Sequence, residues 1–499
     1  MVSTGESSSL GERSVDSFSP RRVFILGAGF SKAVSDLMPL TDTLGEQVAE
    51  KLKIPPDLTR GTFEEWLSRL CEPQPDVSPE ENLHRQAYFQ QIVDFIGAEL
   101  ERKQREAEEA GLPCWLFRFV SVVHFWEPTF ISFNYDTLLE TAASLALLEA
   151  PLAPFMGKSF ISAGDVIGQK PPLPFGPSRA PFSTFRLWKL HGSLAWWWVP
   201  GDITGMTVVR WPLDAEELLF STKTEKMDAF GSGTYEYRLE PDEDEKDRRG
   251  RLLYGRSRYI APPSGSKSSY YQNPFMVKLW QDARRSLEYA NEVYFIGYSM
   301  PPADSAARGL FRESISSDTT IFVVNKCPEQ IVKQLRKWGF ENIEYITGKK
   351  CVEAMVDNFE RERAHEVVER LKEYLSSGKV SLTDDEQSRV IWSKPPNKYG
   401  ALELVDIEMR SLILGPKSNN YGSPENVETQ SQNTERFRKG LTVSKLSTLL
   451  SQNEIEEIVV RVDDGLQKVI DYKPQPRDTG DDGKPSIGGI WLCVAYLPD

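Results

Sequence analysis

Short apolar runs alternate with longer amphipathic stretches between about residues 20 and 380 of this chain. The runs that predict strands are residues 22–26, 129–133, 185–199, 259–261, 292–296, 320–325 and 342–346. The stretches that predict helices are residues 43–53, 62–70, 83–109, 115–125, 137–148, 274–289, 305–316, 328–338 and 351–375. Strands that alternate with helices form a parallel sheet covered on both faces, so we expect an α/β fold with a doubly wound, Rossmann-like sheet.

Three stretches interrupt this alternation within the first three quarters of the chain. Residues 1–20 are rich in Ser and Gly and predict a disordered N-terminus. Residues 149–183 contain many Pro and Gly, and residues 200–257 form a polar insertion. We therefore expect one large domain over residues 21–380, with a helical subdomain at about residues 43–126.

The pattern changes after about residue 381. Residues 415–435 are rich in Asn, Ser, Gly and Gln and predict a mobile loop. Residues 436–499 predict one helix and two or three strands. We expect residues 381–499 to form a C-terminal α+β extension with a role in regulation or assembly. A passive extension is the alternative.

Charge and cysteine content narrow the class of protein. The 499 residues include 59 Lys and Arg against 73 Asp and Glu, a net charge of −14, which disfavours direct binding to nucleic acid or to an anionic membrane. The sequence contains neither the ~18 apolar residues of a membrane span nor an N-terminal secretory signal. Its five cysteines lack any paired zinc-binding spacing, so we expect a cytoplasmic protein without a bound metal.

Residues capable of chemistry follow several of the predicted strands. Gly27-Ala28-Gly29-Phe30-Ser31 follows the first strand, where glycines let the backbone approach a phosphate and a helix N-terminus follows. Asn134-Tyr135-Asp136 follows the second strand, and His191-Gly192-Ser193 follows another apolar strand. Taken singly, each has a structural explanation: a tight turn, a helix cap, or a buried histidine.

Two further strands complete the pattern. Gly297-Tyr298-Ser299 follows the strand at residues 292–296, and Asn325 ends the next strand. The carboxyl ends of parallel strands lie at one edge of a sheet, where ligands of such folds bind. Five such ends together favour a binding site over five independent structural roles.

The order of these motifs resembles the sirtuin superfamily, and most closely the sirtuin-like NAD hydrolases of bacterial antiphage defence. The resemblance covers about residues 20–380. The matching segments are Gly27 to Ser31, Met38-Pro-Leu-Thr41, Asn134 to Asp136 with Leu138-Leu-Glu140, Leu190 to Ser193, and Gly297 to Asp304. The family's deacetylases carry a zinc module with two paired-cysteine motifs that this sequence lacks. The resemblance implies a sirtuin-type fold and favours NAD hydrolysis over deacetylation.

The resemblance also implies roles for individual residues. The catalytic residues would be Asn134 and Asp136 at the nicotinamide ribose and carboxamide, and His191 as the base or orienter for the ribose or the attacking water. Residues that hold NAD would be Gly27, Ala28, Gly29, Phe30 and Ser31 at the pyrophosphate, Thr41 in a covering loop, and Gly297, Ser299 and Asn325 at the adenosine half.

The implied activity is cleavage of the nicotinamide–ribose bond of NAD to ADP-ribose and nicotinamide, in an antiphage effector that a trigger activates. NAD is then a substrate, and no metal is required. The implied partners are further copies of the chain in a homo-oligomer and an ATPase, a nuclease or an Argonaute-like protein of the same defence system. Two alternatives stay open: a protein deacylase or ADP-ribosyltransferase, and a non-catalytic sensor of NAD or ADP-ribose.

Overall fold

The computed structural model describes residues 21–126, 128–147, 185–202, 204, 207–210, 255–265 and 267–376, with separate strand segments and two helical residues between 389 and 494. Four expectations fall wholly or mostly outside the described residues. They are the disordered N-terminus at 1–20, the excursion at 149–183, most of the insertion at 200–257 and nearly all of the loop at 415–435.

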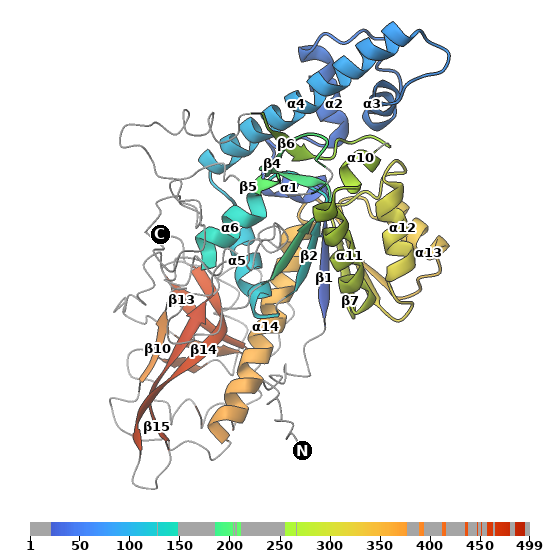
Figure 1. The fold of residues 1–499 in the computed structure, drawn as a ribbon. Coiled ribbons are helices and arrows are strands. Elements are labelled where there is room, and N and C mark those ends of the chain that lie inside the picture. The colour runs from blue at the N-terminus through green and yellow to red at the C-terminus, as the bar shows by residue number, and fades with distance from the viewer. Residues whose placement is uncertain are drawn as a thin grey trace, which may run out of the picture.

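A six-stranded parallel sheet forms the centre of the molecule (Figure 1). Its strands are β1 (Arg22–Leu26), β2 (Thr129–Ser132), β3 (Arg186–Lys189), β7 (Glu292–Ile296), β8 (Thr320–Val324) and β9 (Ile343–Ile346). The spatial order is β3-β2-β1-β7-β8-β9, and every pair is parallel. Counted along the chain this is the 3-2-1-4-5-6 order of a doubly wound sheet, whose direction of winding reverses between β1 and β7. The predicted Rossmann-like α/β arrangement is confirmed.

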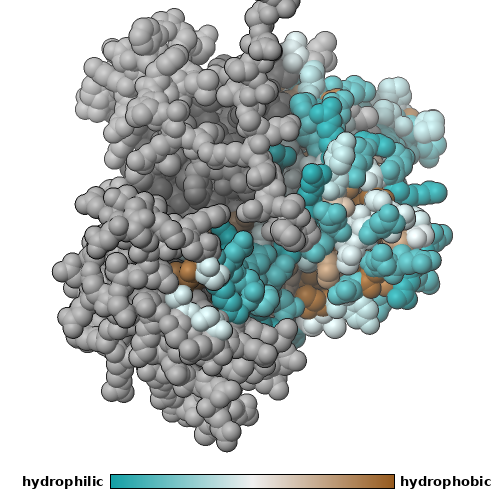
Figure 2. All heavy atoms as spheres, turned by 90° about the horizontal axis from the view of Figure 1, so that it is seen from below, coloured by the Kyte–Doolittle hydropathy of each residue, from teal (hydrophilic) through white to brown (hydrophobic). Residues whose placement is uncertain are grey.

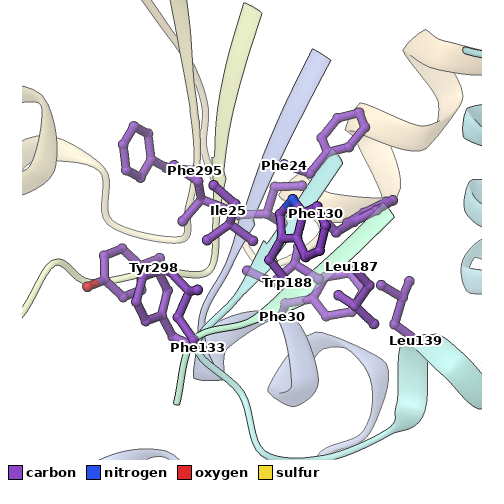
Figure 3. Close-up of a cluster of buried hydrophobic side chains, with 14 of the residues drawn as sticks. Phe24, Ile25, Phe30, Phe130, Phe133, Leu139, Leu187, Trp188, Phe295 and Tyr298 are labelled. Carbon is purple, nitrogen blue, oxygen red and sulfur yellow. The ribbon is translucent and has the colours of Figure 1, made fainter. Parts of the chain in front are cut away.

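Helices cover both faces of this sheet (Figure 1). On one face lie α5 (Cys114–Val123), α6 (Leu138–Leu147) and the long α14 (Cys351–Ser376); on the other lie α11 (Pro274–Glu288), α12 (Ser305–Ser314) and α13 (Glu329–Lys337). Aromatic rings from the sheet and the first face interlock, with Phe24 5.7 Å from Phe119 and 5.0 Å from Phe130 between ring centroids. Figure 3 shows this core continuing from Phe24 to Phe133 and Tyr298 near the carboxyl edge. Burial of these rings is the main force that holds the strands in register.

Three helices form a layer beyond the carboxyl edge of the sheet: α2 (Thr41–Lys51), α3 (Phe63–Cys71) and α4 (Pro79–Glu109) (Figure 1). Their starts follow from capping. Thr62 and Glu65 form a reciprocal capping box on α3, and the Ser78 side chain accepts a hydrogen bond from the Glu81 amide. Because of the Ser78 cap and Pro79, α4 begins four residues before the apolar pattern that predicted it.

The single strand predicted at residues 185–199 is wrong. The chain forms β3 in the parallel sheet, turns at Leu190 and His191, and continues as β4 (Gly192–Trp198) in a separate antiparallel sheet. Gly192 adopts φ +86°, and a Cβ there would lie 1.9 Å from the Tyr259 carbonyl oxygen. Apolar residues lie on both sides of His191-Gly192, so their pattern fits one strand as well as two.

The separate sheet has the order β5-β4-β6, where β5 is Val209–Arg210 and β6 is Ser257–Ile260. The strand predicted at 259–261 therefore pairs with β4 and does not belong to the parallel sheet. Residues 209–210 and 257, which belong to the predicted polar insertion, are part of these strands. This small sheet lies over the carboxyl edge of the large one (Figure 1).

The C-terminal part contains a second six-stranded sheet, with the order β10-β15-β14-β13-β11-β12. Its strands are β10 (Arg389–Ser393), β11 (Leu412–Gly415), β12 (Glu435–Phe437), β13 (Glu457–Val462), β14 (Gly465–Thr479) and β15 (Pro485–Val494). Four of these strands, β12 to β15, overlap residues 436–499, where two or three were expected, and the helix expected there falls mostly outside the described residues. Strands β10 and β11 were not predicted. Strands β13 and β14 lie against α14, so this sheet adjoins the helix that closes the α/β domain.

The described part of the surface seen from below is mainly hydrophilic, with small separate hydrophobic patches (Figure 2). Within the part of the chain that the structure describes, no helix is both long enough and apolar enough to cross a membrane.

Candidate functional site

The five predicted strand ends meet at the carboxyl edge of the parallel sheet, where β1, β2, β3, β7 and β8 lie side by side. Backbone hydrogen bonds continue past the strands: the amide of Gly27 donates to Ile296 O at 3.1 Å, and that of Gly297 donates to Val324 O at 2.9 Å. The first segment therefore lies at the point between β1 and β7 where the winding reverses, the usual ligand position in this class of sheet.

The glycines of the first and fourth segments are packed against each other. A Cβ on Gly29 would lie 2.8 Å from the Gly297 Cα, and a Cβ on Gly27 would lie 2.5 Å from the Tyr298 Cα. Gly297 itself has φ +60°. The amides of Gly29 and Phe30 donate to the carbonyls of Gly297 and Gly27, both at 2.8 Å. A phosphate at this turn must use other amides or displace these two bonds.

Three predicted residues form one buried hydrogen-bonded cluster: Ser31, Asn134 and Asp136. The Ser31 hydroxyl donates to Asp136 Oδ2 at 2.6 Å. The Asn134 side-chain amide donates to Ser31 Oγ and to the Gly27 carbonyl, each at 2.9 Å. Residues 103 and 105 positions apart in sequence thus meet as the sequence predicted, and the cluster joins the ends of β1 and β2.

Two buried side chains support the loop that carries this cluster. Lys189, at the end of β3, donates to the backbone carbonyl of Asp136 and pairs with Glu140 at 3.0 Å. Gln104 on α4 accepts from the Thr137 amide at 2.8 Å and donates to its hydroxyl at 2.7 Å. The loop is therefore fixed from β3 and from the helical layer.

His191 belongs to a second buried group, which we call the ionic cluster: His191, Lys267, Asp304 and Tyr298. The imidazole Nε2 lies 3.3 Å from Lys267 Nζ and 3.4 Å from Asp304 Oδ1. Lys267 Nζ is also 3.3 Å from Asp304 Oδ1, and the Tyr298 hydroxyl donates to Asp304 Oδ2 at 2.9 Å. In one tautomer Nε2 accepts a hydrogen bond from the Lys267 ammonium, and in the other it donates one to the Asp304 carboxylate. Nε2 therefore has a partner in either tautomer.

Burial and neighbouring charges set the protonation of the ionic cluster. Burial, together with the Lys267 ammonium, lowers the pKa of His191 against the opposing effect of Asp304. Burial alone would raise the pKa of Asp304, but His191, Lys267 and the Tyr298 hydroxyl outweigh it and hold that pKa well below its ordinary value. Burial raises the pKa of Tyr298. At neutral pH the imidazole of His191 is therefore uncharged and the Asp304 carboxyl is ionised.

Aromatic side chains connect the two clusters. The Phe133 ring lies 4.9 Å from the His191 ring and 4.8 Å from the Tyr298 ring between centroids, and Phe133 directly precedes Asn134. Figure 3 shows Phe133 and Tyr298 side by side. Tyr135 and Tyr271 lie roughly parallel to the imidazole, each 6.4 Å away between centroids. Three aromatic rings, two of them tyrosines, thus surround the histidine at the carboxyl edge.

The remaining predicted residues lie at different distances from these clusters. The Phe30 side chain packs in the core against Trp115, with 6.0 Å between centroids, so only its backbone is available at the turn. Asn325 is half-buried and donates to the Tyr298 carbonyl at 3.5 Å. Ser299 is exposed, Thr41 is the half-buried first residue of α2, and neither forms a side-chain hydrogen bond with the other predicted residues in the described structure.

Sequence reasoning did not single out Lys267, Lys189 or Gln104. Lys267 lies in a polar loop between β6 and α10 (Ser268–Tyr271), and no periodic pattern places that loop over the sheet. Asp304 was detectable, because it ends the segment that begins at Gly297. A polar residue at the last position of a matched motif is the signal that could have found it.

Among the described residues, no group of three or more His, Cys, Asp or Glu side chains could hold a metal ion. A scan against protein-family models finds no match to this chain, and a search of the curated proteins finds none. The two clusters and the order of the motifs are therefore the features from which a function can be inferred.

Proposed function

We propose that this chain is a sirtuin-type NAD hydrolase whose active site lies at the carboxyl edge of the parallel sheet. The observation that carries the proposal is that the Ser31–Asn134–Asp136 cluster and the buried His191 lie at the same edge of the sheet, beside the point where its winding reverses. A dinucleotide has two nucleoside halves joined by a pyrophosphate, and strand ends on both sides of that point suit such a ligand.

The proposed reaction breaks the bond between the ribose C1′ and the nicotinamide nitrogen. The electron pair leaves with nicotinamide, which becomes neutral, and the ribose carries the positive charge that remains. A water oxygen then bonds to C1′ and loses a proton, so that NAD and water give ADP-ribose, nicotinamide and one proton. The protein has to orient the ribose, stabilise the cation and accept that proton.

The residues present can divide these tasks. The Asn134 amide and the Asp136 carboxylate would hold the nicotinamide ribose, and the negative charge of Asp136 would stabilise the ribosyl cation. Neutral His191 would orient or deprotonate the water, a contribution typically worth a factor of ~10²–10⁴ in rate. The turn at Gly27–Ser31 would approach the pyrophosphate, while Gly297, Ser299 and Asn325 would hold the adenosine half.

One observation favours a second candidate, a non-catalytic module that binds NAD or ADP-ribose. Ser31, Asn134 and Asp136 already satisfy one another with bonds of 2.6–2.9 Å, as structural side chains do. A sensor could use the same edge of the sheet without breaking a bond. This candidate predicts binding of NAD with no release of nicotinamide.

A nicotinamide assay separates the candidates. The full chain is incubated with NAD alone, and free nicotinamide is quantified by chromatography. Release without any acceptor supports hydrolysis. Release that requires an acylated or nucleophilic protein supports a deacylase or an ADP-ribosyltransferase, and binding measured by calorimetry without release supports a sensor.

The regulatory part of the proposal concerns the C-terminal sheet and assembly. An untriggered NAD hydrolase would deplete a central metabolite, so we propose that residues 381–499 control the domain through α14, against which β13 and β14 lie. A homo-oligomer and a partner from a defence system, such as an ATPase, a nuclease or an Argonaute-like protein, remain predictions. Light scattering of the full chain, with and without NAD, tests the first of them.

A further inference from the structure

The ionic cluster contains a buried lysine that the proposed reaction does not require. Lys267 is 7% exposed, and its partner Asp304 is 3% exposed. A buried ammonium is costly unless it is paired, and replacement of such an ion pair by apolar side chains is often neutral or stabilising. A gain in stability therefore does not explain why this ion pair is buried. Its contact with His191 points to an effect on the imidazole.

The geometry shows what the pair does to the imidazole. Nζ of Lys267, Oδ1 of Asp304 and Nε2 of His191 form a triangle with sides of 3.3, 3.3 and 3.4 Å. In the same site, Tyr298 donates to the second carboxylate oxygen at 2.9 Å and so fixes the rotation of the Asp304 side chain. Nε2 of the imidazole is thus in contact with two oppositely charged side chains, Lys267 and Asp304, which also hold each other in place.

The loop that carries Lys267 is anchored from outside the parallel sheet. The amide of Gly265 donates to the Ser68 hydroxyl of α3 at 2.7 Å, and the Tyr259 hydroxyl of β6 donates to the Tyr270 carbonyl at 2.7 Å. These two bonds lie on either side of Lys267 in sequence. Its position therefore depends on the helical layer and on the small antiparallel sheet.

We propose that Lys267 is a positioning residue: held in place by Asp304, its ammonium contacts Nε2 of His191, fixes that nitrogen and adds to the effect of burial in opposing protonation of the imidazole. The catalytic consequence rests on the proposed NAD hydrolysis, but the effect on His191 does not. An uncharged imidazole can accept a proton from water, and it does not repel the positive ribose that forms when nicotinamide leaves. The ammonium opposes protonation of the imidazole, and the carboxylate stabilises the ammonium.

Other titratable groups face this histidine. Tyr135 follows β2, Tyr271 lies on α10 and Tyr298 follows β7, and burial raises the pKa of each, so all three are uncharged at neutral pH. Glu64 on α3 is the further carboxylate that interacts with Lys267 and Asp304. Lys267 is thus the cation that acts on His191 among the groups that the structure describes here.

The test is a histidine titration by NMR, which needs no substrate. The chain has four histidines, so the Cε1 signals are few, and H191Q identifies the one that belongs to His191. We expect a pKa below the ordinary value of 6.5 in the parent. In K267M, where Asp304 acts without its counter-ion, this pKa should rise by about 1 to 3 pH units.

Two matched variants control the experiment. K267R keeps the charge and should leave the His191 titration close to that of the parent. K278M removes a half-exposed lysine that pairs with Asp282 on α11 and should change nothing at His191. A His191 pKa in K267M within about 0.3 pH units of the parent overturns the proposal.

A second pair of variants covers the case in which K267M does not fold. In the D304N background the buried carboxylate is gone, so K267M/D304N leaves no unpaired buried charge. The double variant should show a higher His191 pKa than D304N alone, and equal values contradict the proposal. If the enzyme hydrolyses NAD, the acid limb of kcat/KM should move with the NMR value in each variant. The titration can succeed while NAD hydrolysis fails, so the two claims are tested separately.

Discussion

The two edges of the parallel sheet each bury a cation, but they surround it differently. At the amino edge, Arg22 begins β1, pairs with Glu292 at 2.8 Å and with Glu362, and lies 3.8 Å from the centre of the Trp126 ring. At the carboxyl edge, Lys267 lies between Asp304 and His191. Both cations are less than 8% exposed.

The difference lies in what the neighbours can do. The partners of Arg22 sit on regular elements, β7 and α14, and Arg22 keeps one charge state at every physiological pH. The partners of Lys267 come from the turn after β3 and from the residue that precedes α12, and one of them is a histidine, a side chain whose protonation can change. A buried charge alone therefore does not indicate a functional site. A buried group that can change its protonation, at the edge where ligands bind, does indicate one. Variants at the two edges should separate an effect on stability from an effect on activity.

The largest effect is expected for N134A and H191A at the carboxyl edge. Each should lower NAD cleavage by a factor of at least ~100, because positioning of the ribose or proton transfer is lost. N82A is the matched control, since Asn82 on α4 makes two bonds to the Gln74 backbone, at 2.7 and 2.9 Å. Its activity should equal that of the parent. Rates within threefold of the parent in both site variants would show that the site is wrongly placed.

The amino edge should show the opposite behaviour. R22M removes the guanidinium from between its two carboxylates and should destabilise the domain by about 3 kcal/mol, the low end for breaking a buried pair because Glu292 and Glu362 retain some solvent contact. Thermal unfolding measures the loss, with R21M on the exposed neighbouring residue as the control. The folded R22M protein should cleave NAD as fast as the parent. Reduced turnover in folded R22M would mean that the two edges are coupled.

The pH dependence of stability follows from His191. Its pKa in the folded state is below 6.5, so below pH 6.5 the unfolded chain binds a proton that the folded chain does not, and stability falls as the pH drops. The slope is at most about 1.4 kcal/mol per pH unit for one group. H191Q should flatten the curve of melting temperature between pH 7 and pH 5. An unchanged curve would show that His191 is not held uncharged.

The smallest effect is expected for S68A on α3. This change removes the hydroxyl that accepts the Gly265 amide and should cost about 1 kcal/mol. It should also shift the His191 titration slightly and reduce NAD turnover a few-fold, because the loop of Lys267 loosens. S286A is the control: Ser286 on α11 also uses its hydroxyl in hydrogen bonds, to the Asp282 carbonyl and from Trp188. It should affect stability alone.

The sequence predicted the parallel sheet well because each strand is a short apolar run and each helix has an amphipathic face. It also placed Ser31, Asn134 and Asp136 together, because parallel strands end at one edge. The break at His191 escaped prediction, because the apolar residues on both sides of it fit a single strand equally well. Lys267 escaped because long-range packing of a polar loop, and not local pattern, brings it to the histidine.

In the proposed reaction the ADP-ribosyl group of NAD passes to water at the carboxyl edge. The most direct test is incubation with NAD in water enriched in ¹⁸O, followed by mass spectrometry of the ADP-ribose. We expect equal amounts of nicotinamide and ADP-ribose with one ¹⁸O at C1′ in the parent, and at least ~100-fold less of both products in H191A. Nicotinamide release without labelled ADP-ribose, or bound NAD that stays intact after prolonged incubation with the parent, would contradict it.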